Sequence, residues 1–207
     1  GCDPCVLKCL GYVEQSHLAI RNVAILFEIP RLPAGAVMTS IKDLYFTIYD
    51  KSAIRSLEQR FKISWRICSA VLSVHSWGWL HKDIRSQNIL LVPSGDALGF
   101  TAYLRGFEYA RHVRDSTRMT GDHELEKDLY RHPERQRDPS RPHEKKHDLY
   151  GLGVVLLEIG ALKTVKAILD PWMATFRKQN RQPQPEDIAR KIRTRAAEDL
   201  PILMGSR

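Results

Sequence analysis

The chain has 207 residues, with 43% hydrophobic and 27% charged side chains, which is typical of one soluble globular domain or a large part of one. No apolar stretch approaches the roughly 20 residues that a membrane-spanning helix needs, and the first residues lack the basic and apolar regions of a signal peptide, so we expect an intracellular, cytoplasmic location and no membrane partner. The formal net charge is +8, but the excess lies mainly in loop-like segments with few aromatic residues to stack on bases, which argues against a nucleic-acid partner.

The first predicted elements are two short apolar runs rich in branched residues, at residues 6–13 and 23–29. A polar turn separates them, so the pattern predicts two antiparallel strands. Pro30, Pro33 and Gly35 then interrupt the chain, which is typical of a linker.

A long helix is predicted to begin after Ser56. Ser56 opens a capping-box pattern with Gln59, and apolar residues then recur at steps of three and four. These residues are Leu57, Phe61, Trp65, Cys68 and Leu72. Gly78 is typical of a helix end. We expect the apolar face of this helix to pack into the core.

The segment after this helix carries the most informative motif. It reads His81-Lys82-Asp83-Ile84-Arg85-Ser86-Gln87-Asn88, with a His-x-Asp five residues ahead of an Asn. An apolar run follows at once. Residues 89–93 and 100–104 predict a hairpin across a Ser-Gly-Asp turn.

Three further motifs follow in order. Gly106-Phe107-Glu108 comes directly after the predicted hairpin, and His132-Pro133-Glu134 lies farther on. Asp148 then opens a stretch to Gly160 that is apolar nearly all round, which predicts a buried helix. Beyond it, prolines are expected to divide mostly polar helices. These are Pro171, Pro183, Pro185 and Pro201.

Together these motifs resemble those of the protein-kinase superfamily. The first resembles the catalytic loop H-R-D-x-x-x-x-N, and the second resembles the Asp-Phe-Gly motif. The third resembles the Ala-Pro-Glu that closes the activation segment, and the helix from Asp148 resembles the central helix of the C-lobe. The sequence around Phe107 and His132 also resembles divergent kinase-like domains of filamentous fungi.

The resemblance implies an α+β, protein-kinase-like fold. Residues 1–35 are expected to hold two N-lobe strands and the hinge, and residues 36–207 a mainly helical C-lobe without its final helices. We expect the N-lobe to be incomplete, because no room is left upstream of residue 6 for the glycine-rich phosphate loop, the phosphate-gripping lysine and the helix that orients it.

The resemblance also implies catalytic residues and cofactors. Asp83 would accept the proton of a substrate hydroxyl, Arg85 would face the transferred phosphate, and Asn88 would offer an oxygen to Mg²⁺. We expect binding of ATP and Mg²⁺ to be weak or absent, because Gly106 stands where the family carries its metal-holding Asp and one amide oxygen is a poor magnesium site. Glu108 is the candidate substitute metal ligand, but it lies two residues along an extended segment, about 7 Å away.

The hinge implies a second loss. Phe27 would lie at the back of the adenine pocket, and Glu28 would begin the hinge. Pro30 then falls on the position whose backbone N–H donates to the adenine ring, and proline has no N–H. The lost hydrogen bond is expected to weaken adenine binding by roughly 1 kcal/mol.

The resemblance also implies that four residues hold the C-lobe together. His81 and Phe107 would stack in a hydrophobic spine, and Asp148 would bond the backbone of the catalytic loop. Glu134 matches the glutamate that the family pairs with an arginine, which we expect beyond the last residue of this sequence.

Functions from different classes remain open. The lost metal and phosphate ligands favour a degenerate kinase, or pseudokinase, that acts through protein binding. The alternative is an active, atypical ATP-dependent Ser/Thr protein kinase that uses Asp83 as its base on a protein substrate, if a complete N-lobe lies upstream. A basic module that binds nucleic acid or acidic partners is a third and less favoured interpretation.

Overall fold

The computed structural model describes residues 5–15, 22–43, 56–94, 99–115, 125–136 and 141–205. The helices are α2 (Leu57–Ser76), α3 (Leu125–Asp128), α4 (Lys145–Ala161), α5 (Val165–Lys178) and α6 (Pro185–Leu203). The strands are β1 (Cys9–Gln15), β2 (Asn22–Phe27), β3 (Thr39–Ser40), β4 (Trp79–Leu80), β5 (Ile89–Pro93), β6 (Phe100–Leu104) and β7 (Arg111–His112). Short 3-10 turns occur at Ser86–Asn88, Phe107–Tyr109 and Pro133–Arg135. None of these helices combines the length and apolar character needed to cross a bilayer.

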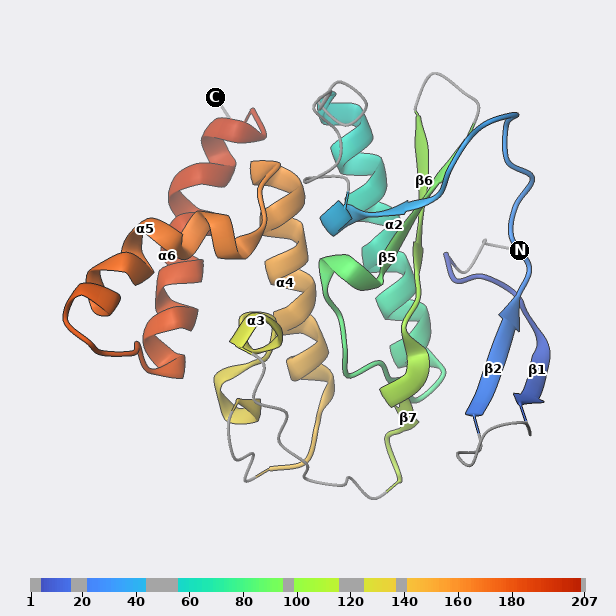
Figure 1. The fold of residues 1–207 in the computed structure, drawn as a ribbon, viewed down its shortest axis with the longest axis horizontal. Coiled ribbons are helices and arrows are strands. Elements are labelled where there is room, and N and C mark those ends of the chain that lie inside the picture. Colours follow the sequence, from blue (N-terminus) through green and yellow to red (C-terminus); the bar gives the residue numbers. More distant parts are fainter. Residues whose placement is uncertain are drawn as a thin grey trace.

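Both predicted strand pairs are present. β1 and β2 form an antiparallel ribbon that stands to one side of the helices (Figure 1). β5 and β6 form the second hairpin at the predicted residues, and β3 adds to β5 to give the order β3-β5-β6. The Leu104 amide donates to the Cys5 carbonyl at 3.2 Å, which ties the first described residues to β6.

The predicted long helix is present as α2, and the Ser56 side chain accepts a hydrogen bond from the Gln59 amide at its first turn. The expectation for its buried face is wrong, because Phe61, Trp65 and Leu72 are 54%, 58% and 69% exposed. Aliphatic residues form the buried face toward β6 and α4, namely Ile63, Ile67, Ala70, Val71 and Val74. The helix is therefore apolar on two sides, and the aliphatic side packs against its neighbours.

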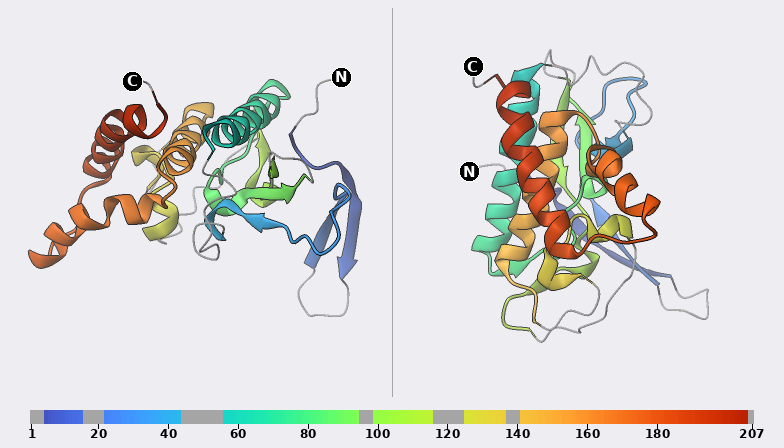
Figure 2. Two further views of the ribbon diagram at one scale, coloured as in Figure 1. Left: turned by 90° about the horizontal axis from the view of Figure 1, so that it is seen from above. Right: turned by 90° about the vertical axis from the view of Figure 1, so that its left-hand side faces the viewer.

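α4 is the central helix, and it is buried along most of its length as predicted. Figure 2 shows α2, α4 and α6 side by side in one layer. Gly151 lets α4 approach the loop after β4, because a Cβ there would lie 2.7 Å from the Ile84 carbonyl oxygen. This close contact fixes the loop that carries the first motif against the core.

Only two of the four prolines after α4 divide helices as expected, since Pro183 lies between α5 and α6 and Pro185 begins α6. Pro171 lies inside α5 and Pro201 inside the last turn of α6. A proline removes one intrahelical hydrogen bond, and tertiary packing of an apolar face outweighs that loss. In α5 that face includes the buried Val165 and Leu169.

Candidate active site

Asp83, Arg85 and Asn88 lie together on the loop between β4 and β5. Arg85 Nε donates to Asp83 Oδ2 at 3.1 Å, and Asn88 Nδ2 donates to the same oxygen at 2.7 Å. Asn88 Nδ2 also donates to the Asp83 backbone carbonyl at 2.8 Å. The amide nitrogen of Asn88 therefore fixes the Asp83 carboxylate in one orientation, and the Asn88 side-chain oxygen is the atom left to bind a metal ion.

Gly106 lies directly against Asn88. Its φ of 86° is left-handed, which a glycine adopts without strain. A Cβ at position 106 would lie 2.5 to 2.7 Å from the side-chain amide atoms of Asn88. Asn88 thus occupies the space that any side chain at position 106 would need.

Asp148 holds the loop from behind. Its buried carboxylate accepts hydrogen bonds from the backbone amides of His81 at 2.8 Å and Lys82 at 2.9 Å. Its oxygens also lie 3.0 and 2.8 Å from ring nitrogens of His75 and His143. Burial alone would raise the pKa of Asp148, but the bonds from His143 and His75 outweigh it and hold the pKa below its ordinary value. These bonds also hold Lys82 at φ 73°, a conformation that costs a non-glycine residue about 1–2 kcal/mol.

The His81 ring connects this loop to the turn after β6. It meets the Phe107 ring edge-on, with centroids 4.6 Å apart. Its Nε2 lies 3.0 Å from the Arg105 carbonyl, and its Nδ1 accepts the Asp83 amide at 3.3 Å. Burial lowers the pKa of His81 despite the nearby carboxylates, so the ring is neutral and Nε2 carries its proton.

Glu134 is held by two residues of α4. Glu134 Oε2 lies 2.8 Å from Lys146 Nζ and 3.2 Å from His147 Nε2. The hydrogen bonds from Lys146 and then His147 lower the pKa of Glu134 to about 2. Lys146 is therefore a cationic partner of Glu134 among the residues that the structure describes.

The same cluster has the spacing of a metal site. Ligand atoms of His132, Glu134 and His147 lie within 4.8 Å of one another. His147 Nδ1 accepts the Glu144 amide at 2.8 Å, so the proton of the neutral ring is on Nε2, and His132 Nδ1 accepts the Glu134 amide at 3.3 Å. A metal binds the free lone pair of a ring nitrogen, and these lone pairs are engaged. The arrangement favours an ion pair over a metal centre.

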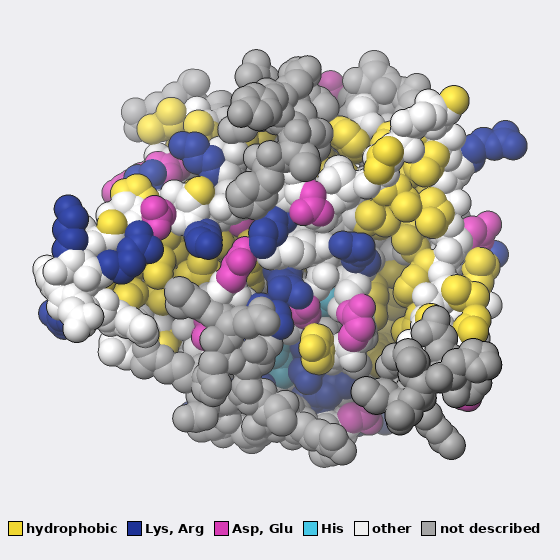
Figure 3. Space-filling model, in the orientation of Figure 1, with side chains coloured by type: hydrophobic (Ala, Val, Ile, Leu, Met, Phe, Trp, Pro, Cys, Tyr) yellow, Lys and Arg dark blue, Asp and Glu magenta, His cyan; other side chains and the backbone are white. Residues whose placement is uncertain are grey.

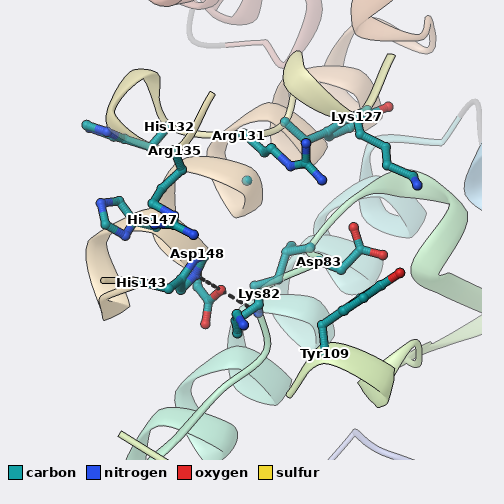
Figure 4. Close-up of a pocket in the computed structure, with 13 residues that line it drawn as sticks. Lys82, Asp83, Tyr109, Lys127, Arg131, His132, Arg135, His143, His147 and Asp148 are labelled. Carbon is teal, nitrogen blue, oxygen red and sulfur yellow. Dashed lines mark hydrogen bonds and ion pairs between the residues drawn. The ribbon is translucent and has the colours of Figure 1, made fainter. Parts of the chain in front are cut away.

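A pocket of about 370 Å³ opens beside Asp83. Its walls come from the loop after β4, from the turn Phe107–Tyr109, from the chain between the start of α3 and the turn Pro133–Arg135, and from the chain around the start of α4. Figure 4 shows side chains from these segments converging on the space between Asp83 and Asp148. Among the lining residues that sequence reasoning missed are three cations. These are Lys127, Arg131 and Arg135, whose only signal is a cation every four residues around the His-Pro-Glu motif.

The family pattern described as "Protein kinase domain" matches residues 20–193, more than half of the chain and all of the loops above. This chain belongs to the protein kinase family. It is similar to Serine/threonine-protein kinase Nek1 of Mus musculus, with 37% identity over 98 residues, or 47% of this chain. The match covers 8% of that relative's length. The predicted superfamily and fold class are confirmed, whereas the fungal resemblance and the division near residue 35 stay predictions.

Three expected cofactor residues of the kinase domain do not line the pocket beside Asp83. Phe27 ends β2, and Glu28 forms an exposed ion pair with Lys8 at 3.1 Å. Glu28 lines a separate, open hollow with Pro30. Glu108 is exposed on the turn Phe107–Tyr109. Of the residues that the structure describes, these three are not in the lining of the pocket beside Asp83.

None of the sequence motifs predicted the buried polar network behind the kinase loop. Ser86 Oγ lies 2.8 Å from the Tyr130 hydroxyl, and that hydroxyl donates to Glu158 Oε1 at 2.6 Å. The Val165 amide donates to the same oxygen at 2.6 Å. Burial raises the pKa of Glu158 to about 7, against the opposing effect of these hydrogen bonds. The network joins the catalytic loop to α4 and α5.

Proposed function

We propose that this protein kinase domain is a pseudokinase that acts by binding protein partners inside the cell. The packing of Asn88 against Gly106 carries the proposal. Position 106 offers no side-chain ligand, and the Asn88 amide, whose nitrogen donates to Asp83, offers a single oxygen. Mg²⁺ favours octahedral sites of carboxylate and phosphate oxygens, and this donor set does not fit it.

The charge requirements of phosphoryl transfer support the same proposal. Catalysis of this reaction consists mainly of alignment and of cations that neutralise the transferred group. The Arg85 guanidinium donates to Asp83 Oδ2, so this cation is engaged with the candidate base. Pro30 has no N–H to offer an adenine ring. Weak or absent ATP binding follows from both losses.

Two observations favour a second candidate function, an atypical Ser/Thr protein kinase. Asp83, Arg85 and Asn88 are held in one hydrogen-bonded loop, as a working base and its neighbours would be. The chain is also similar to a protein named as a Ser/Thr kinase. In this alternative, Asp83 would orient the substrate hydroxyl and take its proton.

Nucleotide binding and turnover distinguish the two functions. Thermal unfolding is measured with ATP, with and without Mg²⁺, and labelled phosphate incorporation is measured on the chain itself and on a generic protein substrate. We expect no magnesium-dependent shift and no incorporation. A magnesium-dependent shift, together with turnover that Asp83→Asn abolishes and the exposed control Asp170→Asn retains, would refute the pseudokinase and establish the enzyme.

A further inference from the structure

The outer side of α2 carries an apolar stripe. The exposed residues of this helix, all of which the structure describes, are Leu57, Glu58, Phe61, Trp65, Leu72 and Ser76. Most of them are large and apolar, and Glu58 is the one exposed charge among them. A surface helix ordinarily places polar and charged residues opposite its buried face, and a helix that is apolar all round is ordinarily buried. The stripe therefore has the composition of a surface that another structure covers.

A second set of exposed apolar side chains lies on the ribbon of β1 and β2, and Figure 3 shows hydrophobic side chains over that part of the molecule. Successive residues of a strand point to opposite faces, so the exposed Tyr12 and Val13 lie on different faces of the ribbon. The stripe on α2 instead follows one side of one helix. Figure 2 shows this helix at one end of the layer of α2, α4 and α6. Of the two surfaces, α2 is the one shaped to receive a second helix.

The spacing of the stripe is that of a coiled-coil seam. Phe61, Trp65, Cys68 and Leu72 follow one another at intervals of four, three and four residues. Such a seam packs against another helix that lies nearly parallel or antiparallel to it. The occupant that the seam fits is therefore a helix with the same repeat.

The side-chain sizes of the seam match an antiparallel copy of the seam itself. With a two-fold axis between residues 66 and 67, Phe61 lies opposite Leu72 of the other copy, and Trp65 lies opposite Cys68 of the other copy. The largest side chain then faces the smallest, as the facing positions of a packed interface require. A parallel pair would place Trp65 against Trp65 and leave a gap between the two copies of Cys68.

The charges at the edge of the stripe favour the same orientation. In the antiparallel pair Lys62 comes beside Ser69 of the other copy, whereas in a parallel pair Lys62 faces Lys62 and the two cations repel. Burial raises the pKa of the Cys68 thiol, so the seam carries no charge near neutral pH. Size and charge thus select one arrangement of two copies.

The area of the stripe is sufficient for a weak dimer. Phe61, Trp65 and Leu72 are each more than half exposed, and Leu57 is exposed at the start of the helix. From the surface of such side chains, the stripe offers about 450 Å² per copy, and a rim around it brings the total for two copies to about 1,000 Å². This is the lower limit for a specific interface, so we expect a reversible dimer with micromolar affinity.

We propose that two copies of this chain associate through antiparallel packing of α2 against α2. A two-fold axis brings the same stripe from each copy together, so the assembly closes at two subunits. None of Leu57, Phe61, Trp65 and Leu72 lines the pocket beside Asp83, so the interface is separate from that pocket. Self-association goes beyond the proposed function and does not depend on it.

The mass of the chain in solution tests the proposal. Sedimentation velocity is measured over about 1–200 µM, the range in which an interface of this size dissociates, with a reducing agent present throughout. We expect the mass to rise from 23.8 kDa toward twice that value as the concentration increases. Tryptophan emission should shift to longer wavelength on dilution, as Trp65 becomes exposed to water. Trp65→Phe should lose that shift.

Two charged substitutions test the orientation. Phe61 and Leu72 are exposed in a single copy, so Phe61→Lys and Leu72→Glu should fold, which circular dichroism checks. Each variant alone should weaken dimerisation at least about tenfold, because the dimer would bury a charge in an apolar seam. An equimolar mixture should recover the dimer, because the introduced lysine would lie opposite the introduced glutamate. A parallel pair brings these two positions nowhere near each other.

Ile25→Lys is the matched control, since it places the same charge on the exposed ribbon. It should leave the dimer unchanged. A mass of 23.8 kDa at every concentration would overturn the proposal and leave the stripe to an amphipathic helix of a different protein. A mixture of Phe61→Lys and Leu72→Glu that stays monomeric would rule out the antiparallel arrangement. A dimer lost in Ile25→Lys and retained in Phe61→Lys would place the interface on the ribbon and refute the assignment to α2.

The outcome is separate from that of the proposed function. Nucleotide turnover would refute the pseudokinase and leave a dimer through α2 standing. A monomeric chain that binds no nucleotide would retain the proposed function and lose only the dimer.

Discussion

The buried carboxyl of Glu158 should make folding stability depend on pH in an unusual direction. Its pKa rises from an ordinary value of 4.5 to about 7 because burial disfavours the charged form more than the hydrogen bond from Tyr130 favours it. A carboxyl whose pKa is raised in the folded state favours folding when it is protonated. Its contribution is complete below pH 4.5 and is lost as the pH rises through 7.

The size of the effect follows from that rise. About 1.4 kcal/mol per pKa unit gives a total of about 3 kcal/mol, of which about 2.5 kcal/mol is lost between pH 5 and pH 8. Buried histidines oppose it below their ordinary pKa, because burial lowers the pKa of His81, His132 and His147 and their neutral forms favour folding. A difference between variants isolates Glu158, since the histidines contribute equally to both.

The assay is urea unfolding followed by tryptophan fluorescence at pH 5, 6, 7 and 8. Relative to the unmodified chain, the free energy of unfolding of Glu158→Gln should increase by about 2.5 kcal/mol from pH 5 to pH 8. Glu198→Gln, on the exposed part of α6, should show no such trend. A pH-independent difference for Glu158→Gln would refute the reasoning, because it would mean that the carboxyl keeps an ordinary pKa in the fold.

Three further predictions concern the loop and its supports. Asp148→Asn should lower the free energy of unfolding by about 3 kcal/mol, because the buried donors would lose the negatively charged carboxylate that they bind. A loss below about 1 kcal/mol by urea unfolding would contradict this. Gly106→Asp should not create magnesium-dependent ATP binding in a thermal-shift assay, and should cost about 2 kcal/mol as Asn88 gives up two hydrogen bonds; a magnesium-dependent shift would count against it. The ionised Glu134 stabilises the fold above pH 4.5, its ordinary pKa, and this contribution is lost as the pH falls toward 2. The difference in unfolding free energy between Glu134→Gln and the unmodified chain, followed by circular dichroism, should therefore close between pH 4.5 and pH 2. Lys146→Gln, which keeps Glu134, should make stability less dependent on pH over the same range.

Local features of the sequence determined most of the secondary structure and the family. The run at residues 89–93 and its partner at 100–104 have the length and composition of a hairpin, and the structure has strands at those residues. Ser56 begins α2 because its side chain can accept a backbone hydrogen bond three residues on. The His81 to Asn88 spacing identified the kinase loop, since that chemistry depends on a short run of consecutive residues.

Tertiary structure decided which surfaces are buried and which charges meet. α2 is apolar on two sides, and the packing of its aliphatic side against β6 and α4 decided that Trp65 faces outward. The convergence of Lys82 with Arg135 and the position of Asn88 against Gly106 join residues that are distant in the sequence. Hydrogen-bond periodicity and capping act over a few residues and can be read from the sequence. Packing, burial and electrostatics depend on neighbours that only the folded chain brings together.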